Sequence, residues 1–240
     1  MYDGKNLSVI IAAYNEENNI LKTMQRVQKS VPKAEIIVVD DGSKDNTTKV
    51  ARLIKSKNVR VISYKKNKGK GYAIRTGINN ATRKIQAQID ADSQFPPEEL
   101  PNLLRPILQN KADIVFVSRF VKGSKIQKGS LTRMRRLANF VVSGFTSMLC
   151  KKRFTDVNAG FKAWKSDAIR DIDIKCQHFG YEPEIAIKGI EKGYRFMEVP
   201  VNYKGRQKGI SNVKLLRDGV IIPAYLLRLK LSLILKRRFK

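Results

Sequence analysis

The stretch "LSVIIAAYNEENNILKTMQRVQKS" (residues 7–30) joins two patterns whose order indicates the fold. Residues 7–14 are apolar almost throughout, which is typical of a strand buried on both faces of a sheet. The residues after Glu16 place their apolar side chains on one side of a predicted helix, at Ile20, Leu21, Met24 and Val27. A buried strand followed by an amphipathic helix predicts a parallel sheet whose strands are connected by helices.

The same alternation continues through the first half of the chain. The further predicted strands are residues 35–43, 59–64, 85–90 and 112–119, and the predicted helices are residues 16–30, 44–57 and 71–81. We therefore expect an α/β fold, with a mostly parallel sheet covered by helices on both faces.

Polar clusters follow three of the predicted strands. They are Tyr14-Asn15-Glu16, Asp40-Asp41-Gly42-Ser43 and Asp90-Ala91-Asp92. Ligands of open α/β sheets bind beyond the carboxyl ends of the strands, so the three clusters are expected to converge on one rim. The alternative, that these residues only cap the following helices, suits Asp45 but explains the set of three poorly.

The cluster after the strand 85–90 has the pattern of a metal site. Alternate side chains of an extended segment share one face, so Asp90 and Asp92 can meet one hard cation, with Gln94 as a neutral oxygen ligand. Mg²⁺ or Mn²⁺ held there would bridge the oxygens of a nucleoside diphosphate and stabilise a departing phosphate. An Asp-x-Asp pattern is common by chance, but its place after a sheet strand strengthens the prediction.

Composition limits the classes of partner and chemistry. The chain has 240 residues with 48 Lys+Arg against 21 Asp+Glu, a net charge of +27 that favours anionic partners. One histidine, His178, and two separated cysteines, Cys150 and Cys176, leave little for Ser-His-Asp chemistry, histidine-rich metal sites or disulfides. The N-terminal residues lack the pattern of a signal peptide, so we expect a cytosolic, reducing location.

Six motifs come in a familiar order: "SVIIAAYNEENNI", "IIVVDDGSKDNT", "NKGKGYAIRTGI", "DADSQFPPEEL", "DVNAGFKAWKSD" and "EVPVNYKGRQKGIS". The chain resembles glycosyltransferase family 2 over roughly residues 7–213, and within it the dolichyl- and polyprenyl-phosphate sugar synthases. The resemblance implies a GT-A (Rossmann-like) fold, a nucleotide-sugar donor, a divalent metal, and inverting transfer to a lipid phosphate at a membrane surface. The donor is left open between GDP-mannose and a UDP-sugar.

The resemblance also implies residue roles. The nucleotide pocket would be lined by Ala12, Tyr14, Glu16, Asp40 and Lys70. Asp90 would face the donor sugar or the metal shell, while Asp92 and Gln94 would be direct ligands of Mg²⁺ or Mn²⁺. Ser93 and Phe95 stand where the family usually has Leu and His, which weakens the subfamily assignment more than metal binding.

A lipid-phosphate acceptor needs cations rather than a base. Its second pKa is about 6, so near neutral pH it is already mostly a dianionic nucleophile. Arginine grips phosphate oxygens with a fixed fork of donors. The candidates are Arg119, either Arg133 or Arg136, and Arg206. For any single arginine the alternative is a solvated surface charge.

Glu184 or Glu182 is the expected contact to acceptor or sugar hydroxyls, again by the resemblance. The alternative is that these acids only favour the start of a helix by interacting with its dipole.

Two shorter apolar segments point to a membrane surface. Residues 137–149 are flanked by basic residues, as in a helix that lies in the membrane interface, although a buried core helix is the alternative. The tail 219–240 is rich in Leu and Ile and has six basic residues from Arg228 onward. We predict a glycosyltransferase domain over 1–215 and a basic membrane-surface segment over 216–240, attached peripherally to anionic lipid on the cytoplasmic face.

Two other functions compete. A family 2 enzyme that glycosylates a sugar or cell-wall polymer would need a carboxylate base beside its acceptor. A nucleic-acid-binding protein is suggested by charge alone, but the aromatic residues are not interleaved with the basic runs, so we expect no nucleic-acid partner.

Overall fold

Seven strands of the described part of the chain form one central sheet. The computed structural model describes residues 2–205 and 215–238, and the side chains of 2–205 and 221–235. The strands are β1 (Leu7–Ala13), β2 (Glu35–Asp40), β3 (Val59–Ser63), β4 (Ile85–Asp90), β5 (Ile114–Ser118), β7 (Phe161–Lys165) and β8 (Phe196–Pro200). Their order is β3-β2-β1-β4-β7-β5-β8, and all neighbours are parallel except β7, which runs antiparallel to β4 and β5. A short parallel ribbon joins β6 (Lys125–Ile126) to β9 (Asn202–Tyr203).

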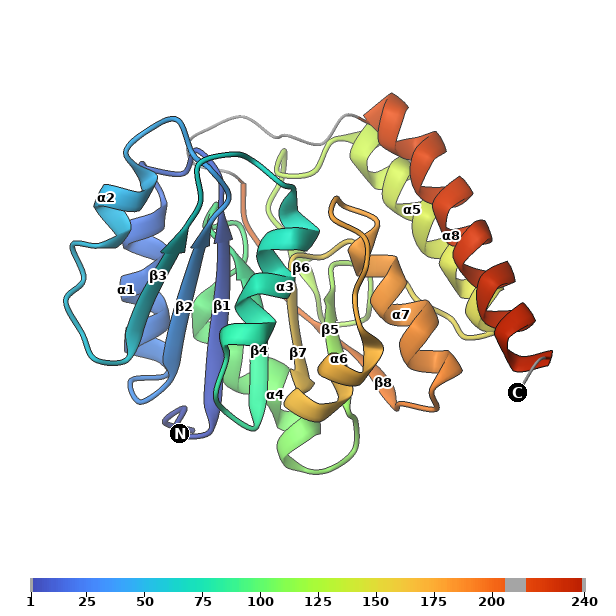
Figure 1. The fold of residues 1–240 in the computed structure, drawn as a ribbon, viewed down its shortest axis with the longest axis horizontal. Helices are drawn as coiled ribbons and strands as arrows, with labels where there is room; N and C mark the ends of the chain where they lie inside the picture. The colour runs from blue at the N-terminus through green and yellow to red at the C-terminus, as the bar shows by residue number, and fades with distance from the viewer. Residues whose placement is uncertain (1, 206–214, 239–240) are drawn as a thin grey trace.

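Helices cover both faces of this sheet (Figure 1). They are α1 (Ile20–Ser30), α2 (Thr47–Ala51), α3 (Lys70–Asn80), the 3-10 turn η1 (Pro97–Glu99), α4 (Leu100–Leu108), α5 (Arg133–Cys150), α6 (Ser166–Ile172), α7 (Tyr181–Glu191) and α8 (Leu215–Arg238). The apolar sides of α1 and α4 pack on one face of the sheet, and those of α3, α6 and α7 on the other. Two cores result because every central strand is buried on both sides, as the continuous apolar runs predict.

The predicted fold class is confirmed, with two local differences. The helix expected over 44–57 is shorter, α2 (Thr47–Ala51). It begins late because the side chain of Asp45 accepts hydrogen bonds from the Thr47 backbone and hydroxyl and so holds a turn before the helix. The antiparallel strand β7 was not predicted, since "FKAWK" (161–165) carries two lysines.

Helices α5 and α8 lie side by side at one edge of the molecule, packed over α7 (Figure 1). Helix α5 carries large apolar side chains on its exposed side as well as on its buried side, unlike a typical surface helix of a soluble domain. Polar Asn139, Ser143 and Thr146 are buried, whereas Phe140 is 73% exposed. The exposed large apolar side chains of α5 are Met134, Leu137, Phe140, Val141 and Met148, and those of α8 are Ile221, Leu227, Leu231, Ile234 and Leu235. We call this set the two-helix apolar face.

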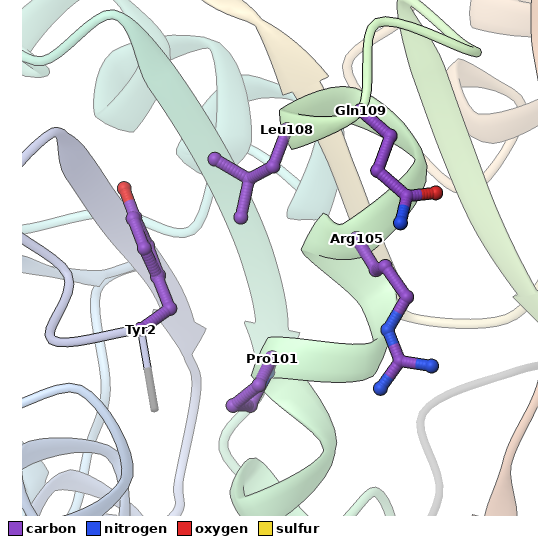
Figure 2. A pocket seen from close by; sticks show the side chains of 5 residues that line it. All are labelled: Tyr2, Pro101, Arg105, Leu108 and Gln109. Atoms are coloured by element: carbon purple, nitrogen blue, oxygen red, sulfur yellow. The ribbon is translucent and has the colours of Figure 1, made fainter.

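A separate hollow lies at the other end of the sheet from the polar clusters. Figure 2 shows its lining side chains, Tyr2, Pro101, Arg105, Leu108 and Gln109. Tyr2 precedes β1 and the other four come from α4 and the residue after it, so the hollow faces away from the carboxyl ends of the parallel strands. It contains none of the predicted site residues.

Candidate active site

The register of the sheet brings the three polar clusters together. Ala12 of β1 lies opposite Asp90 of β4, and Ala13 lies opposite Asp40 of β2. The carboxyl ends of β2, β1 and β4 therefore form one rim, as expected for an open α/β sheet. Tyr14 follows directly and is half-buried there, and the backbone N–H of Glu16 donates to Thr47 at 2.8 Å.

The Asp40-Asp41 pair shapes the loops at this rim. The carboxylate of Asp40 is buried and accepts hydrogen bonds from Ser43 and Thr48. Asp41 accepts from the backbone N–H groups of Lys68 at 2.8 Å and Gly69 at 2.9 Å. Burial raises the pKa of Asp41, and these two N–H groups oppose the rise. Asp41 thereby fixes the loop that leads into α3.

Lys70, at the start of α3, holds Asp90 at the rim. Its Nζ lies 2.8 Å from Asp90 Oδ1 and 3.0 Å from Oδ2. Burial alone lowers the pKa of Lys70, but attraction by Asp90, Tyr181 and Glu182 outweighs it and raises the pKa well above its ordinary value. The ammonium group is therefore charged at neutral pH, and about a fifth of the side chain is exposed (20%) at the rim.

The carboxylate of Asp90 also depends on a glycine. A Cβ on Gly160 would lie 1.9 Å from Asp90 Oδ2 and 2.2 Å from Cγ, far inside contact distance. The glycine in "DVNAGFKAW" thus leaves room for the carboxylate, in addition to any turn it permits. This close approach places β7 directly against the Asp-x-Asp segment.

Beneath Asp90 lies a buried polar cluster. Glu182 of α7 has its Oε1 3.3 Å from Lys162 Nζ and 3.6 Å from Lys70 Nζ, and it accepts from the Tyr181 hydroxyl at 3.0 Å. Gln88 of β4 donates to the same hydroxyl at 2.7 Å. Burial lowers the pKa of Lys162, with Glu182 opposing that effect. The cluster connects the interior of the sheet to the rim.

Asp92 and Gln94 follow Asp90 in the chain and are both buried. The backbone N–H of Gln94 donates to Asp92 Oδ1 at 3.1 Å, and the Gln94 side-chain amide donates to the Lys204 carbonyl at 3.3 Å. Ser93 hydrogen-bonds with Thr23 and Phe95 packs in the core, so the two residues that depart from the family pattern have structural roles.

The donor set at this rim suits a hard divalent cation. Within 2–205 and 215–238, no group of three or more His, Cys, Asp or Glu side chains forms a complete metal cage. Two carboxylates and an amide oxygen are instead the partial set that Mg²⁺ uses when substrate phosphates supply other ligands. Asp92 and Gln94 are oxygen donors whose chemistry suits a metal that arrives with a nucleotide, and Asp90 lies beside them in the chain with both of its oxygens paired with Lys70.

The predicted arginines are placed differently from one another. Arg119 forms a two-pronged pair with buried Asp156, with Nε 2.6 Å from Oδ2 and Nη2 2.7 Å from Oδ1, and its guanidinium lies 4.9 Å from the Tyr203 ring centre. Its fork is thus already engaged within the protein. Arg133 and Arg136 are exposed in the first turn of α5, and Arg206 lies outside the described residues.

The two glutamates of α7 face different ways. Glu182 joins the cluster with Lys70, whereas Glu184 accepts from the backbone N–H groups of Lys175 and Cys176 and lies 2.6 Å from Lys188. Residues two apart on a helix point to nearly opposite sides, which explains the separation. The loop that Glu184 holds packs closely on Gly69 and Gly71.

Sequence reasoning missed Lys162, Tyr181, Gln88 and Asp156. A lysine inside the apolar run "GFKAW" was the available signal, because a charge in a buried strand requires a buried partner. The position of that partner, on a helix some twenty residues later, has no local pattern.

A comparison with protein families matches residues 8–172 to the sequence profile described as "Glycosyl transferase family 2". The chain belongs to glycosyl transferase family 2. The matched region spans β1 to α6 and includes the whole Asp-x-Asp rim.

Curated relatives of this family 2 chain include lipid-phosphate enzymes. It is 33% identical over 211 residues to the dolichol-phosphate mannosyltransferase of Pyrococcus furiosus, covering 87% of this chain and 59% of that protein. It is 29% identical to the undecaprenyl-phosphate mannosyltransferase of Micrococcus luteus, covering 85% and 86% of the two chains. The chain thus spans less than two thirds of the length of the Pyrococcus protein.

Among solved structures, glucosyl-3-phosphoglycerate synthase from Mycobacterium tuberculosis, solved with Mn²⁺, UDP and glucosyl-3-phosphoglycerate, superposes with a TM-score of 0.70. The two share 21% identity, and the match covers 94% of this chain and 80% of that one. This similarity shows the GT-A fold.

Proposed function

We propose that this family 2 protein transfers a sugar from a nucleotide sugar, GDP-mannose or a UDP-hexose, to a polyprenyl or dolichyl phosphate, with inversion at the sugar carbon. The observation that carries the proposal is the rim at which Lys70 holds Asp90 beside Asp92 and Gln94. The lipid-phosphate mannosyltransferases among its relatives support the acceptor class.

The donor half of the site would work by charge. Asp92 and Gln94, with Asp90, would hold Mg²⁺ or Mn²⁺, which supplies Lewis-acid stabilisation of the leaving diphosphate. Lys70 has a protonated ammonium at the rim and would contact the same diphosphate. Asp90, fixed by Lys70, would orient the donor sugar. Ala12, Tyr14, Glu16 and Asp40 would line the nucleotide pocket, with Asp40 acting by shaping its loop.

The acceptor half would need no dedicated base, because a phosphate monoester is already ionised near neutral pH. Asp90 and Glu182 are consistent with a reaction that needs no carboxylate base, because both lie within ion-pair distance of lysines. Arg206, together with either Arg133 or Arg136, would guide the acceptor phosphate. Arg119 would contribute by holding Asp156 and the loop beside Gly160 rather than by gripping phosphate with a free fork.

The two-helix apolar face supports peripheral attachment to a membrane. None of the helices that the structure describes is long and apolar enough to cross a bilayer. An exposed apolar face fits a helix lying in the interface, with Arg133, Arg135 and Arg136 at one end to attract anionic headgroups. We place this surface on the cytoplasmic leaflet, where nucleotide sugars are available to it.

Vesicle binding tests the membrane part. The double variant Leu137→Asp/Phe140→Asp should bind vesicles containing anionic lipid at least about 100-fold more weakly, because burying each side chain is worth roughly 2 kcal/mol. Leu53→Asp is the matched control, since Leu53 is 65% exposed but lies outside this face. Equal loss in the control, or none in the double variant, would refute the assignment.

Transfer itself is tested with labelled donors. The protein is incubated with radiolabelled GDP-mannose, UDP-glucose and UDP-N-acetylglucosamine and a short polyprenyl phosphate, with and without Mn²⁺. Label that enters the lipid phase only with metal identifies donor and acceptor together. Transfer to a free sugar but not to lipid phosphate would instead support the hydroxyl-acceptor alternative.

A further inference from the structure

A lysine lies in the middle of the sheet, below the proposed donor site. Lys162 of β7 is fully buried, donates a hydrogen bond to the Ala159 carbonyl, and has its Nζ 4.8 Å from the centre of the Phe116 ring. Burying an ammonium group is costly unless a carboxylate pairs with it. Glu182, at 3.3 Å, is that carboxylate.

Charges of alternating sign lead from this lysine to the rim. The Oε1 atom of Glu182 is shared by Lys162 and Lys70, at 3.3 and 3.6 Å. Lys70 in turn is shared by Glu182 and Asp90, with the Asp90 contact shorter at 2.8 Å. The Glu182 side chain is 3% exposed and that of Asp90 is 22% exposed. The Lys70 ammonium therefore lies between an inner carboxylate, Glu182, and an outer one, Asp90.

We infer that Lys162 is a positioning residue for the donor site: by pairing with Glu182, it weakens the pull of Glu182 on Lys70 and leaves the Lys70 ammonium at the rim. This inference rests on the proposed function, in which Lys70 contacts the diphosphate. Without the charge of Lys162, Glu182 competes fully with Asp90, and an ordinary ion-pair contact of about 2.8 Å to Glu182 draws the ammonium inward by about 1 Å. A hydrogen bond to a charged group is worth about 10- to 100-fold in affinity, so loss of the Lys70 contact to the diphosphate should weaken nucleotide binding by about that factor.

Binding of GDP and of UDP, each with Mn²⁺, measures this effect by calorimetry without requiring turnover. Lys162→Met should weaken binding of the preferred nucleotide about tenfold or more, while its Glu182 still has Lys70 as a partner and the fold persists. Lys162→Gln also removes the charge but keeps a polar side chain, so it should show the same weakening if the Met variant folds poorly. Lys165→Met is the matched control, because Lys165 lies on the same strand, pairs with Asp113 and faces the other end of the sheet.

Two double variants separate positioning from a general structural role. Lys162→Met/Glu182→Gln removes both the charge and the carboxylate it offsets, so nothing draws Lys70 inward and affinity should return to within a few-fold of the wild type. In a Lys70→Met background, adding Lys162→Met should change nucleotide affinity no further, because the effect passes through Lys70.

The possible failures are distinct. If the wild-type protein binds neither nucleotide with Mn²⁺, the proposed function fails and this inference fails with it. If the wild type binds but the Lys162 variants bind equally well, only the positioning role is overturned. The same holds if the Lys162→Met/Glu182→Gln protein stays as weak as Lys162→Met.

Discussion

A methyl group at Gly160 offers the sharpest test of the Asp90 site. In Gly160→Ala the new Cβ would lie 1.9 Å from Asp90 Oδ2, and ordinary contact begins at 3.4 Å. The carboxylate must therefore move by about 1.5 Å, which breaks its contacts with Lys70 at 2.8 and 3.0 Å. Because the atoms that yield are the end of a side chain, the fold should survive the change.

Gly160→Ala should lower the rate of sugar transfer more than it lowers the free energy of unfolding. Displacement of a positioned group by more than 1 Å lowers rates by about 100-fold, or about 2.7 kcal/mol of transition-state stabilisation. Loss of the charged contact should lower the free energy of unfolding by only about 1–3 kcal/mol. Sugar transfer to polyprenyl phosphate and urea denaturation, measured on the same preparation, separate the two effects.

Gly144→Ala serves as the control, because a Cβ there meets no atom within 4 Å. It should transfer sugar at the wild-type rate and be slightly more stable, as expected for Ala over Gly inside a helix. Wild-type transfer by Gly160→Ala would refute the reasoning, since Asp90 would then be displaced without consequence.

Three further outcomes follow from the structure. Asp92→Ala should abolish Mn²⁺-dependent transfer and Mn²⁺ binding by calorimetry while the protein stays folded, with the free energy of unfolding lowered by about 1–3 kcal/mol because the Gln94 N–H loses its acceptor; near-normal transfer would mean that the metal binds elsewhere. Arg195 and Lys165 lower the pKa of Asp113 well below its ordinary value of 3.8, so the stability it gives is complete above that value and is lost as pH falls towards the folded pKa. Urea titrations should therefore show that Asp113→Asn removes about 1 kcal/mol of the wild-type loss between about pH 7 and pH 3, and equal losses in both proteins would contradict this. Burial raises the pKa of Cys150 to about 12, so in a Cys176→Ser background iodoacetamide at about pH 8 should react only as fast as the chain unfolds; rapid labelling of the native protein would show that this thiol is accessible.

Much of the site could be predicted because its signals are local. Continuous apolar strands predict a sheet covered on both faces, and polar residues directly after parallel strands must meet at the carboxyl edge of that sheet. Asp90, Asp92, Gln94 and Lys70 follow from that rule together with the family resemblance, and the structure places Asp90 and Lys70 in contact.

The remainder depends on pairings between distant segments. Lys162 occurs in a strand whose composition argues against burial, and the carboxylate that pairs with it, on Glu182, comes twenty residues later in the chain. The choice between Glu182 and Glu184 likewise depends on which side of α7 faces the sheet. The sequence does not indicate which of the two glutamates lies on that side. The engagement of Arg119 by Asp156 joins segments 37 residues apart.

If the two-helix apolar face lies in a membrane as proposed, its exposed side chains on α5 and α8 would change how the enzyme meets the proposed lipid acceptor. A protein held by these two helices samples acceptors by lateral diffusion, so its turnover would follow the mole fraction of phosphorylated lipid in the bilayer rather than the bulk amount added. Diluting the acceptor with inert phospholipid at constant total acceptor would then slow the reaction, and assays in detergent would report micelle composition as much as catalysis.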